Sequence, residues 1–229
     1  MDDNGEVLEN IVKESGALTS FAVTADLPTG HCIALVDKDE RTLCANLGAA
    51  AKYETSDLWT KNNINILQHV KVIYVEGFFL NHSFEATMEL ATFAKNNEKI
   101  LIFNLCGEYV CKDKTYCEQV LQLLPFVNFI FGNQSEYLSF ISTVETRLES
   151  HPDTIRRLHD IITANNEESK AEDDDDDDEK EVNINNLTAV VTDGNNPVKY
   201  CCLGSTWENI SLDVPRLQKE LIKVVMSAI

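Results

Sequence analysis

The spacing of hydrophobic and polar residues changes near residue 50. Before that point, residues 5–16 carry apolar positions at helical spacing, and short apolar runs follow at 21–23, 32–36 and 42–47. Turn residues separate these runs. We therefore predict a short helix followed by three strands in a meander, because consecutive strands joined by tight turns tend to pair in order.

Beyond residue 48, apolar runs alternate with amphipathic segments. The pattern predicts strands at 70–75, 100–105, 127–131 and 187–192, shorter strands at 198–203 and 221–225, and helices at 56–67, 83–95, 114–124, 134–140 and 155–163. Strands that alternate with helices of about 10 to 15 residues are typical of βαβ units. We predict an α/β fold with a mostly parallel sheet, helices on both of its faces, and a small β lid at residues 19–47.

The chain is strongly acidic, with a net charge of −19 over 229 residues. Eleven acidic residues and two lysines fall within 165–183, including six consecutive aspartates. This charge argues against nucleic acid or a membrane surface as the main partner. A calcium loop needs ligands spaced around the ion and a glycine at its turn, and the run has neither. We therefore predict a disordered, solvated insert at 165–183.

Cysteine usage and the absence of apolar spans suggest a compartment. None of the seven cysteines forms a CxxC pair, which fits reduced thiols packed as small hydrophobic residues. The N-terminus has no apolar signal-peptide core, and no apolar run approaches the roughly 20 residues of a membrane span. We expect a monomeric cytoplasmic protein, with the nucleus as the alternative location.

Polar and small residues follow four of the predicted strands, at 76–78, 104–106, 132–136 and 192–194. Ligands bind at the carboxyl ends of the strands in open α/β sheets. In the third of these segments, an Asn and a Glu one helical turn apart have two interpretations. They could hold hydrated Mg²⁺, or they could cap the following helix. The Walker A, GxGxxG and GxSxG motifs are all absent.

The chain contains an ordered set of short motifs: PTGHC at 28–32, RTLCANL at 41–47, EGFFL at 76–80, FGNQSE at 131–136 and VTDG at 191–194. In their order and approximate spacing, these motifs resemble the adenosine kinases, which belong to the ribokinase-like sugar and nucleoside kinases. The resemblance covers most of the chain apart from the acidic insert and the last few residues. It implies transfer of phosphate from ATP, with Mg²⁺, to the 5′-hydroxyl of adenosine, giving AMP for purine salvage.

The resemblance also assigns roles to individual residues. It places the adenine and ribose pocket at Cys32, Leu43, Ala45, Phe78 and Tyr109, where Tyr109 replaces the family's usual Phe. Arg41 would stabilise the transferred phosphate. Asn133 and Glu136 would organise Mg²⁺ and its water, with Glu136 acting on the metal through that water. The resemblance assigns contacts with the ATP phosphates to Thr192 and Gly194.

Two departures from the family suggest an incomplete chain. The family's first strand, with its ribose-binding carboxylate and Gly-Gly…Asn motif, has no counterpart, and neither does Asp-Thr-x-Gly-Ala-Gly-Asp, whose last Asp is the general base. We expect a partial kinase core at 1–18 and 48–229, inactive or nearly so, with an exposed apolar sheet face. Two alternatives remain: a non-catalytic scaffold whose acidic tract binds a basic protein, and a kinase for ribose or another nucleoside.

Overall fold

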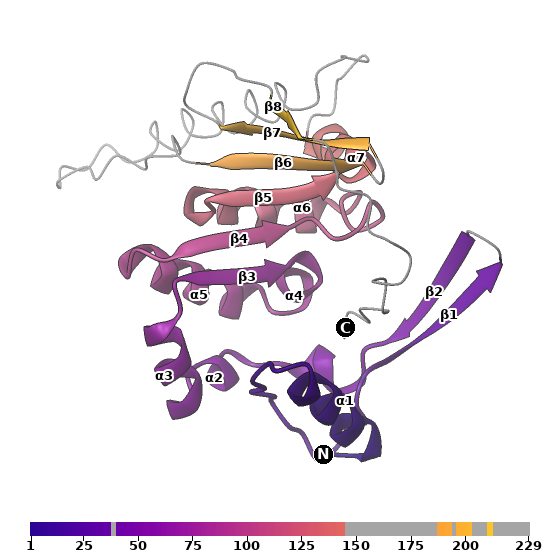
Figure 1. Ribbon diagram of the computed structural model, residues 1–229, viewed down its shortest axis with the longest axis vertical. Coiled ribbons are helices and arrows are strands. Elements are labelled where there is room, and N and C mark those ends of the chain that lie inside the picture. The colour runs from indigo at the N-terminus through magenta and orange to yellow at the C-terminus, as the bar shows by residue number, and fades with distance from the viewer. Residues whose placement is uncertain (38–39, 145–186, 194–195, 203–209, 213–229) are drawn as a thin grey trace. The chain divides into compact units, whose positions relative to one another are not determined.

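The computed structural model describes residues 1–37, 40–144, 187–193, 196–202 and 210–212 (Figure 1). These residues fall into two compact units, one within residues 1–69 and the other within 70–212. The helix predicted at 155–163, the strand predicted at 221–225 and the acidic insert lie outside the described residues. None of the described helices is both long enough and apolar enough to cross a lipid bilayer.

The first unit consists of four helical segments and one hairpin. Its elements are α1 (Asp3–Glu14), β1 (His31–Asp37), β2 (Glu40–Asn46), η1 (Gly48–Lys52), α2 (Thr55–Leu58) and α3 (Lys61–His69). Helix α1 begins as an N-capped helix should, because the Asp2 carboxylate accepts a hydrogen bond from the Gly5 N–H at 2.9 Å. Strands β1 and β2 pair antiparallel along their whole length.

Two predictions for this unit were wrong. Residues 21–23 are not a strand, so the predicted three-stranded meander is a two-stranded hairpin. The single helix predicted at 56–67 is broken into α2 and α3. The break has a local cause, since the Thr60 hydroxyl accepts a hydrogen bond from the Asn63 N–H at 3.2 Å and so starts a new helix.

The second unit is built on a six-stranded sheet whose strands follow one another in chain order. The strands are β3 (Val72–Glu76), β4 (Ile100–Asn104), β5 (Phe129–Asn133), β6 (Thr188–Asp193), β7 (Asn196–Cys202) and β8 (Ile210–Leu212). The first four are parallel, and the last two pair antiparallel. The mostly parallel sheet is thus confirmed, and every strand predicted between 70 and 203 is present.

Between the parallel strands, the described residues form four helices and one short 3₁₀ turn: α4 (Gly77–His82), α5 (Phe84–Asn96), α6 (Lys114–Leu123), η2 (Leu124–Phe126) and α7 (Gln134–Val144). Helix α4 was not expected. It begins directly at the end of β3, and Gly77 allows it to do so. A Cβ at this position would lie 2.3 Å from the Tyr116 hydroxyl and 2.7 Å from the Asn104 carbonyl oxygen.

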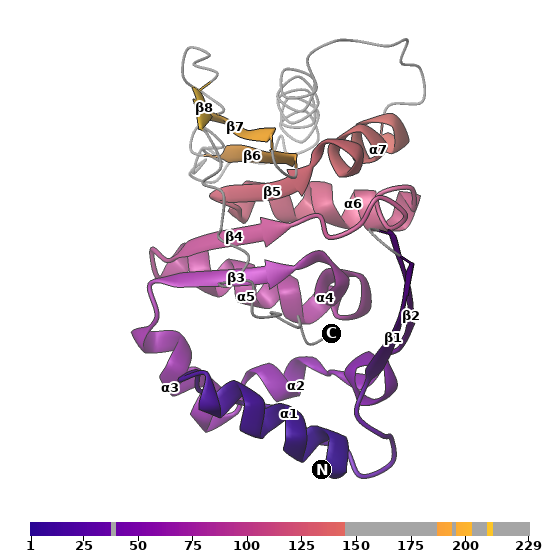
Figure 2. The same cartoon turned by 45° about the vertical axis from the view of Figure 1, so that its right-hand side comes forward.

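Within the described part of the second unit, the helices cover one face of the sheet, not both (Figures 1 and 2). Right-handed crossovers between strands taken in order place every helix on the same side. The side chains facing the helices form the core, including Val75, Phe103 and Ile130, which are at most 4% exposed. On the opposite face, Val72 and Tyr74 remain 47% and 55% exposed. An exposed apolar sheet face was expected, and these residues confirm it.

Candidate functional site

The carboxyl ends of the four parallel strands lie along one edge of the sheet, where the arrowheads of β3, β4 and β5 point in Figure 1. In the strand register, Glu76 pairs with Asn104, and Asn133 pairs with Thr192. Thr192 is exposed, and its hydroxyl lies 3.4 Å from the Gly132 carbonyl oxygen. Polar residues from all four strand ends therefore line this edge. Gly194 lies outside the described residues.

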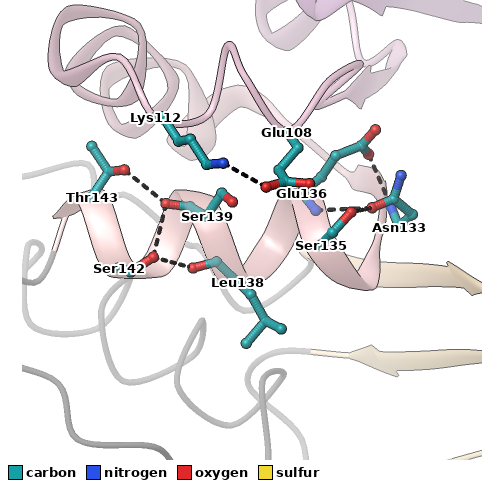
Figure 3. A network of polar contacts seen from close by, with 9 residues as sticks. All are labelled: Glu108, Lys112, Asn133, Ser135, Glu136, Leu138, Ser139, Ser142 and Thr143. Atoms are coloured by element: carbon teal, nitrogen blue, oxygen red, sulfur yellow. Dashed lines mark hydrogen bonds and ion pairs between the residues drawn. The ribbon is translucent and has the colours of Figure 1, made fainter.

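Asn133 and Glu136 bind each other reciprocally at the start of α7 (Figure 3). The Asn133 side-chain oxygen accepts from the Glu136 N–H at 2.8 Å, and a Glu136 carboxylate oxygen accepts from the Asn133 N–H at 2.9 Å. The Ser135 hydroxyl also donates to the Asn133 oxygen, at 2.7 Å. This arrangement is a capping box. The helix-cap interpretation is confirmed, and the magnesium interpretation remains a prediction.

The Glu136 carboxyl group is in an unfavourable place for a negative charge. Its residue is only 7% exposed. Burial raises the pKa of Glu136, the hydrogen bond from Asn133 opposes that shift, and the nearby charge of Glu76 adds to it. A cation at this edge would offset the cost of burying the Glu136 charge. It would also reduce the repulsion between the carboxylates of Glu136 and Glu76.

These residues fit only part of a magnesium shell. Among the described residues there is no cluster of three or more His, Cys, Asp or Glu side chains that could hold a metal. The Asn133 oxygen is already occupied by two donors. A Mg²⁺ ion keeps several waters and takes phosphate oxygens as ligands. The chemistry therefore suits a hydrated ion beside Glu136 and not a site built from protein ligands alone.

Two aromatic residues assigned to the nucleoside pocket lie together at the same edge. Phe78 is on α4, directly after β3, and Tyr109 is in the segment after β4. Their ring centroids are 6.2 Å apart with an interplanar angle of 30°. Tyr109 is 72% exposed. A tilted aromatic pair of this kind can stack on a flat base.

A polar cluster next to this pair was not assigned any role from the sequence. The Tyr74 hydroxyl donates to the Glu76 carboxylate at 2.6 Å, and the Asn104 amide donates to the Tyr74 oxygen at 3.0 Å. The sequence does hold a signal, because Tyr74 and Glu76 are two residues apart and so share one strand face. Pairing with Asn104 depends on the register between β3 and β4, which the sequence does not provide.

The remaining assigned residues are on the hairpin of the first unit. Cys32 pairs with Ala45, and Ala34 pairs with Leu43, so the three assigned residues Cys32, Leu43 and Ala45 share one face of the hairpin. All three are exposed. Arg41 pairs with Val36 in the backbone register of the same hairpin. The hairpin thus places on one face the three residues that the family resemblance assigns to the pocket, and that assignment remains a prediction.

A cavity of about 260 Å³ lies at the other end of the sheet strands. Its lining includes Lys95, Lys99, Phe126 and Leu187, close to where β4 and β6 begin. Parallel α/β sheets bind their ligands at the opposite, carboxyl edge. We therefore place the candidate site at the polar edge and not in this cavity.

The sequence matches the profile of the pfkB family of carbohydrate kinases over residues 2–200. The chain belongs to this family. Among curated pfkB relatives, it is 33% identical over 141 residues to the adenosine kinase of Schizosaccharomyces pombe, and 29% identical over 135 residues to that of Dictyostelium discoideum. These matches cover 61% and 59% of this chain, but only 41% and 39% of the relatives.

Solved structures share the fold of this chain. The adenosine kinase of Anopheles gambiae, solved with P1,P4-di(adenosine-5) tetraphosphate, matches with a TM-score of 0.75 and 25% identity. The match covers 95% of this chain and 59% of that one. The Schistosoma mansoni adenosine kinase, solved with 2-fluoroadenosine, matches at a TM-score of 0.73 and 22% identity, over 96% and 58% of the two chains. The ribokinase-like fold predicted from the sequence is confirmed.

Proposed function

We propose that this pfkB-family chain carries the nucleoside-binding and nucleotide-binding edge of an adenosine kinase. The reaction is transfer of the terminal phosphate of ATP to the 5′-hydroxyl of adenosine, giving AMP. The observation that carries the proposal is the Phe78–Tyr109 pair at the carboxyl edge of the sheet. Relatives named as adenosine kinases, and the adenosine-type ligands named with the solved structures, support the choice of substrate.

In this proposal the base stacks on the aromatic pair of the second unit. Apolar contacts with the nucleoside are assigned, by the family resemblance, to residues of the hairpin. Stacking on an aromatic ring is tolerant of the exact ring, so Tyr109 can serve where a Phe is usual. Cys32, Leu43 and Ala45 share a hairpin face that can cover a purine and its ribose. Arg41 is assigned to the charge on the transferred phosphate, since a guanidinium binds phosphate oxygens in a bidentate manner.

The strand ends of β5 and β6 are assigned to ATP and Mg²⁺. Glu136 would hold the hydrated ion through water, and Asn133 would orient it. Thr192 would donate its hydroxyl to a phosphate oxygen, with Gly194 contributing a backbone N–H. Bound Mg²⁺ supplies neutralisation of charge between the β- and γ-phosphates. The capping box keeps the Glu136 carboxylate at the start of α7, so that its position does not depend on the ion.

We propose that the 229 residues bind substrates far better than they turn them over. Their sequence contains no Asp-Thr-x-Gly-Ala-Gly-Asp motif, and so no counterpart of the family's general base. A general base is typically worth about 10²–10⁴ in rate. Turnover should therefore fall well below the ~1–100 s⁻¹ of typical kinases. AMP formation at rates in that range would contradict this part of the proposal.

The proposed function is tested by calorimetric binding of adenosine to the purified chain, with ribose as the comparison ligand. Adenosine should bind and ribose should not, because the aromatic pair recognises a base. Tyr109→Ala should weaken adenosine binding by about tenfold or more, since stacking contributes about 1–3 kcal/mol per base. Tyr109→Phe is the matched control and should bind as the wild type does, because it keeps the ring.

Either of two results would overturn the assignment. If adenosine does not bind the wild-type chain, the edge is not a nucleoside site. If ribose binds as tightly as adenosine, the aromatic pair does not recognise a base, and the chain is closer to a sugar kinase. A role of the acidic tract in binding a basic protein would appear separately, as salt-sensitive binding lost on deletion of residues 172–179.

A further inference from the structure

Polar side chains at the ends of β3 and β4 form a continuous chain of hydrogen bonds. It begins at Glu76, passes through the Tyr74 hydroxyl at 2.6 Å, and continues from that oxygen to the Asn104 amide at 3.0 Å. The side-chain oxygen of Asn104 then accepts from the Cys106 N–H at 3.2 Å. Side chains of one strand therefore reach the backbone of the turn that follows the next strand.

The turn at Cys106 needs this support. Cys106 has a φ of +70°, a conformation that non-glycine residues rarely adopt and that costs of order 1–3 kcal/mol. Its thiol is also engaged, because the sulfur accepts from the Gly77 N–H at 2.8 Å and lies 3.3 Å from the Asn104 carbonyl oxygen. The strained turn is thus held on one side by Asn104 and on the other by the first residue of α4.

These contacts join the two segments that carry the aromatic pair. Phe78 directly follows Gly77, and Tyr109 lies three residues after Cys106. The network therefore fixes the two backbone positions from which the rings project. The centroids of the two rings are 6.2 Å apart. Without it, the strained turn would be free to relax, and the segment bearing Tyr109 would move relative to α4.

We propose that Tyr74 is a positioning residue for base recognition: it acts through Asn104 and Cys106 to set the spacing of Phe78 and Tyr109. This inference rests on the proposed function, since it assumes that the aromatic pair binds a base. Tyr74 does not need to touch the ligand.

The protonation state of Tyr74 suits this role. Although Tyr74 is 55% exposed, partial burial, followed by the hydrogen bond to Glu76, raises the pKa of Tyr74 to about 12. The phenol therefore stays protonated throughout the physiological pH range and always has a proton to donate to Glu76. Its oxygen remains an acceptor for the Asn104 amide. The chain of hydrogen bonds keeps a single direction under all ordinary conditions.

The test is Tyr74→Phe, which removes the hydroxyl and keeps the ring. Losing the central link should weaken adenosine binding about three- to tenfold, measured by calorimetry. The matched control is Tyr200→Phe, on β7 of the same sheet and outside the network, which should leave affinity unchanged.

A double-mutant cycle distinguishes the positioning role of Tyr74 from a general contribution of Tyr74 to stability. If Tyr74 acts through the aromatic pair, Tyr74→Phe should cost almost nothing further in a Tyr109→Ala background. Hydrogen exchange gives a readout that needs no ligand, and the amides of residues 105–113 should exchange faster in Tyr74→Phe than in the control. Full additivity with Tyr109→Ala, or unchanged exchange in this segment, would overturn the inference.

The outcomes also separate this inference from the proposed function. If the wild type binds adenosine and Tyr74→Phe binds equally well, the positioning role is wrong and the nucleoside site stands. If the wild type does not bind adenosine, the proposed function fails, and the role in base recognition fails with it.

Discussion

At the scale of single residues, Glu136 serves both the helix and the site. Its carboxylate completes the capping box of α7, yet it is buried beside the negative charge of Glu76. A glutamine in its place would keep an oxygen for the Asn133 N–H without carrying a charge. The charge is therefore a cost to folding that the cap alone does not require, and a bound cation would offset it.

This cost should appear as a pH dependence that Glu136→Gln removes. The folded-state pKa of Glu136 is raised above 4.5, so its contribution to stability is fully present below pH 4.5 and is lost as pH rises through the folded pKa. As the pH rises above 4.5, the free energy of unfolding of the wild type should therefore fall relative to that of Glu136→Gln, until the folded-state carboxyl group is fully ionised. Urea unfolding followed by circular dichroism measures the difference.

The control is Glu136→Ala, which loses the hydrogen bond from Asn133 at every pH and should be less stable than Glu136→Gln by about 1 kcal/mol. Parallel pH profiles for the wild type and Glu136→Gln would contradict the prediction.

Residue-level prediction from the sequence succeeded where function depends on one segment. The Asn133–Glu136 pair was found because the two residues are three positions apart in the sequence, and a capping box at a helix start needs only that local spacing. Tyr74 was not found, because its partner Asn104 is 30 residues away and its role depends on the register of two strands. Contacts across strands are the part of the site that a single sequence leaves undetermined.

At the scale of elements, the hairpin depends on the backbone contact at its base. Gly48 has a φ of +50°, and a Cβ there would lie 2.3 Å from the Pro28 carbonyl oxygen. That same oxygen accepts from the Ala49 N–H at 2.8 Å. The segment after β2 is therefore tied to the segment before β1, which closes the hairpin at its open end.

Gly48→Ala should destabilise the first unit by about 1–3 kcal/mol, because it adds a steric clash to the cost of a positive φ. Gly16→Ala is the matched control. Gly16 also has a positive φ, of +85°, but nothing lies within 4 Å of its added Cβ. The control should cost about 1 kcal/mol from backbone strain alone. Equal losses in chemical unfolding of the two variants would show that the contact with Pro28 does not matter.

Long periodic elements were predicted well, and the errors have local causes. Strands β3 to β7 and helices α5, α6 and α7 follow from apolar runs and amphipathic spacing. Helix α4 was missed because six residues give too little periodicity to detect. The predicted strand at 21–23 failed because strand propensity does not provide a pairing partner.

At the scale of the whole molecule, the sheet is covered by described helices on one face only. Residues such as Val72, at 47%, and Ile100, at 40%, stay exposed on the other face. The expectation of helices on both faces followed from the alternation of strands and helices, which does not reveal the order of the strands in the sheet. Because the parallel strands follow one another in chain order, the described helices that connect them lie on the same face.

The exposed face should make the chain prone to self-association. Val72→Thr combined with Ile100→Thr should reduce both binding of a hydrophobic dye and light scattering, because both positions lose apolar surface. The melting temperature should hardly change, since exposed substitutions stay within about 0.5 kcal/mol. Ile73→Thr, on the core face and 7% exposed, should instead cost about 1–3 kcal/mol. Dye binding unaffected by the double substitution would mean that the face is covered in solution.

The sequential strand order has a consequence for biosynthesis. Each strand of the second unit pairs with the one made just before it, so no strand has to insert between two that are already in place. Strands β3, β4 and β5, with the helices between them, need nothing translated after residue 144. A nascent chain leaves the ribosome at about 5–20 residues per second. It can therefore assemble this sheet from one end, adding each new strand to the edge of the strands already formed.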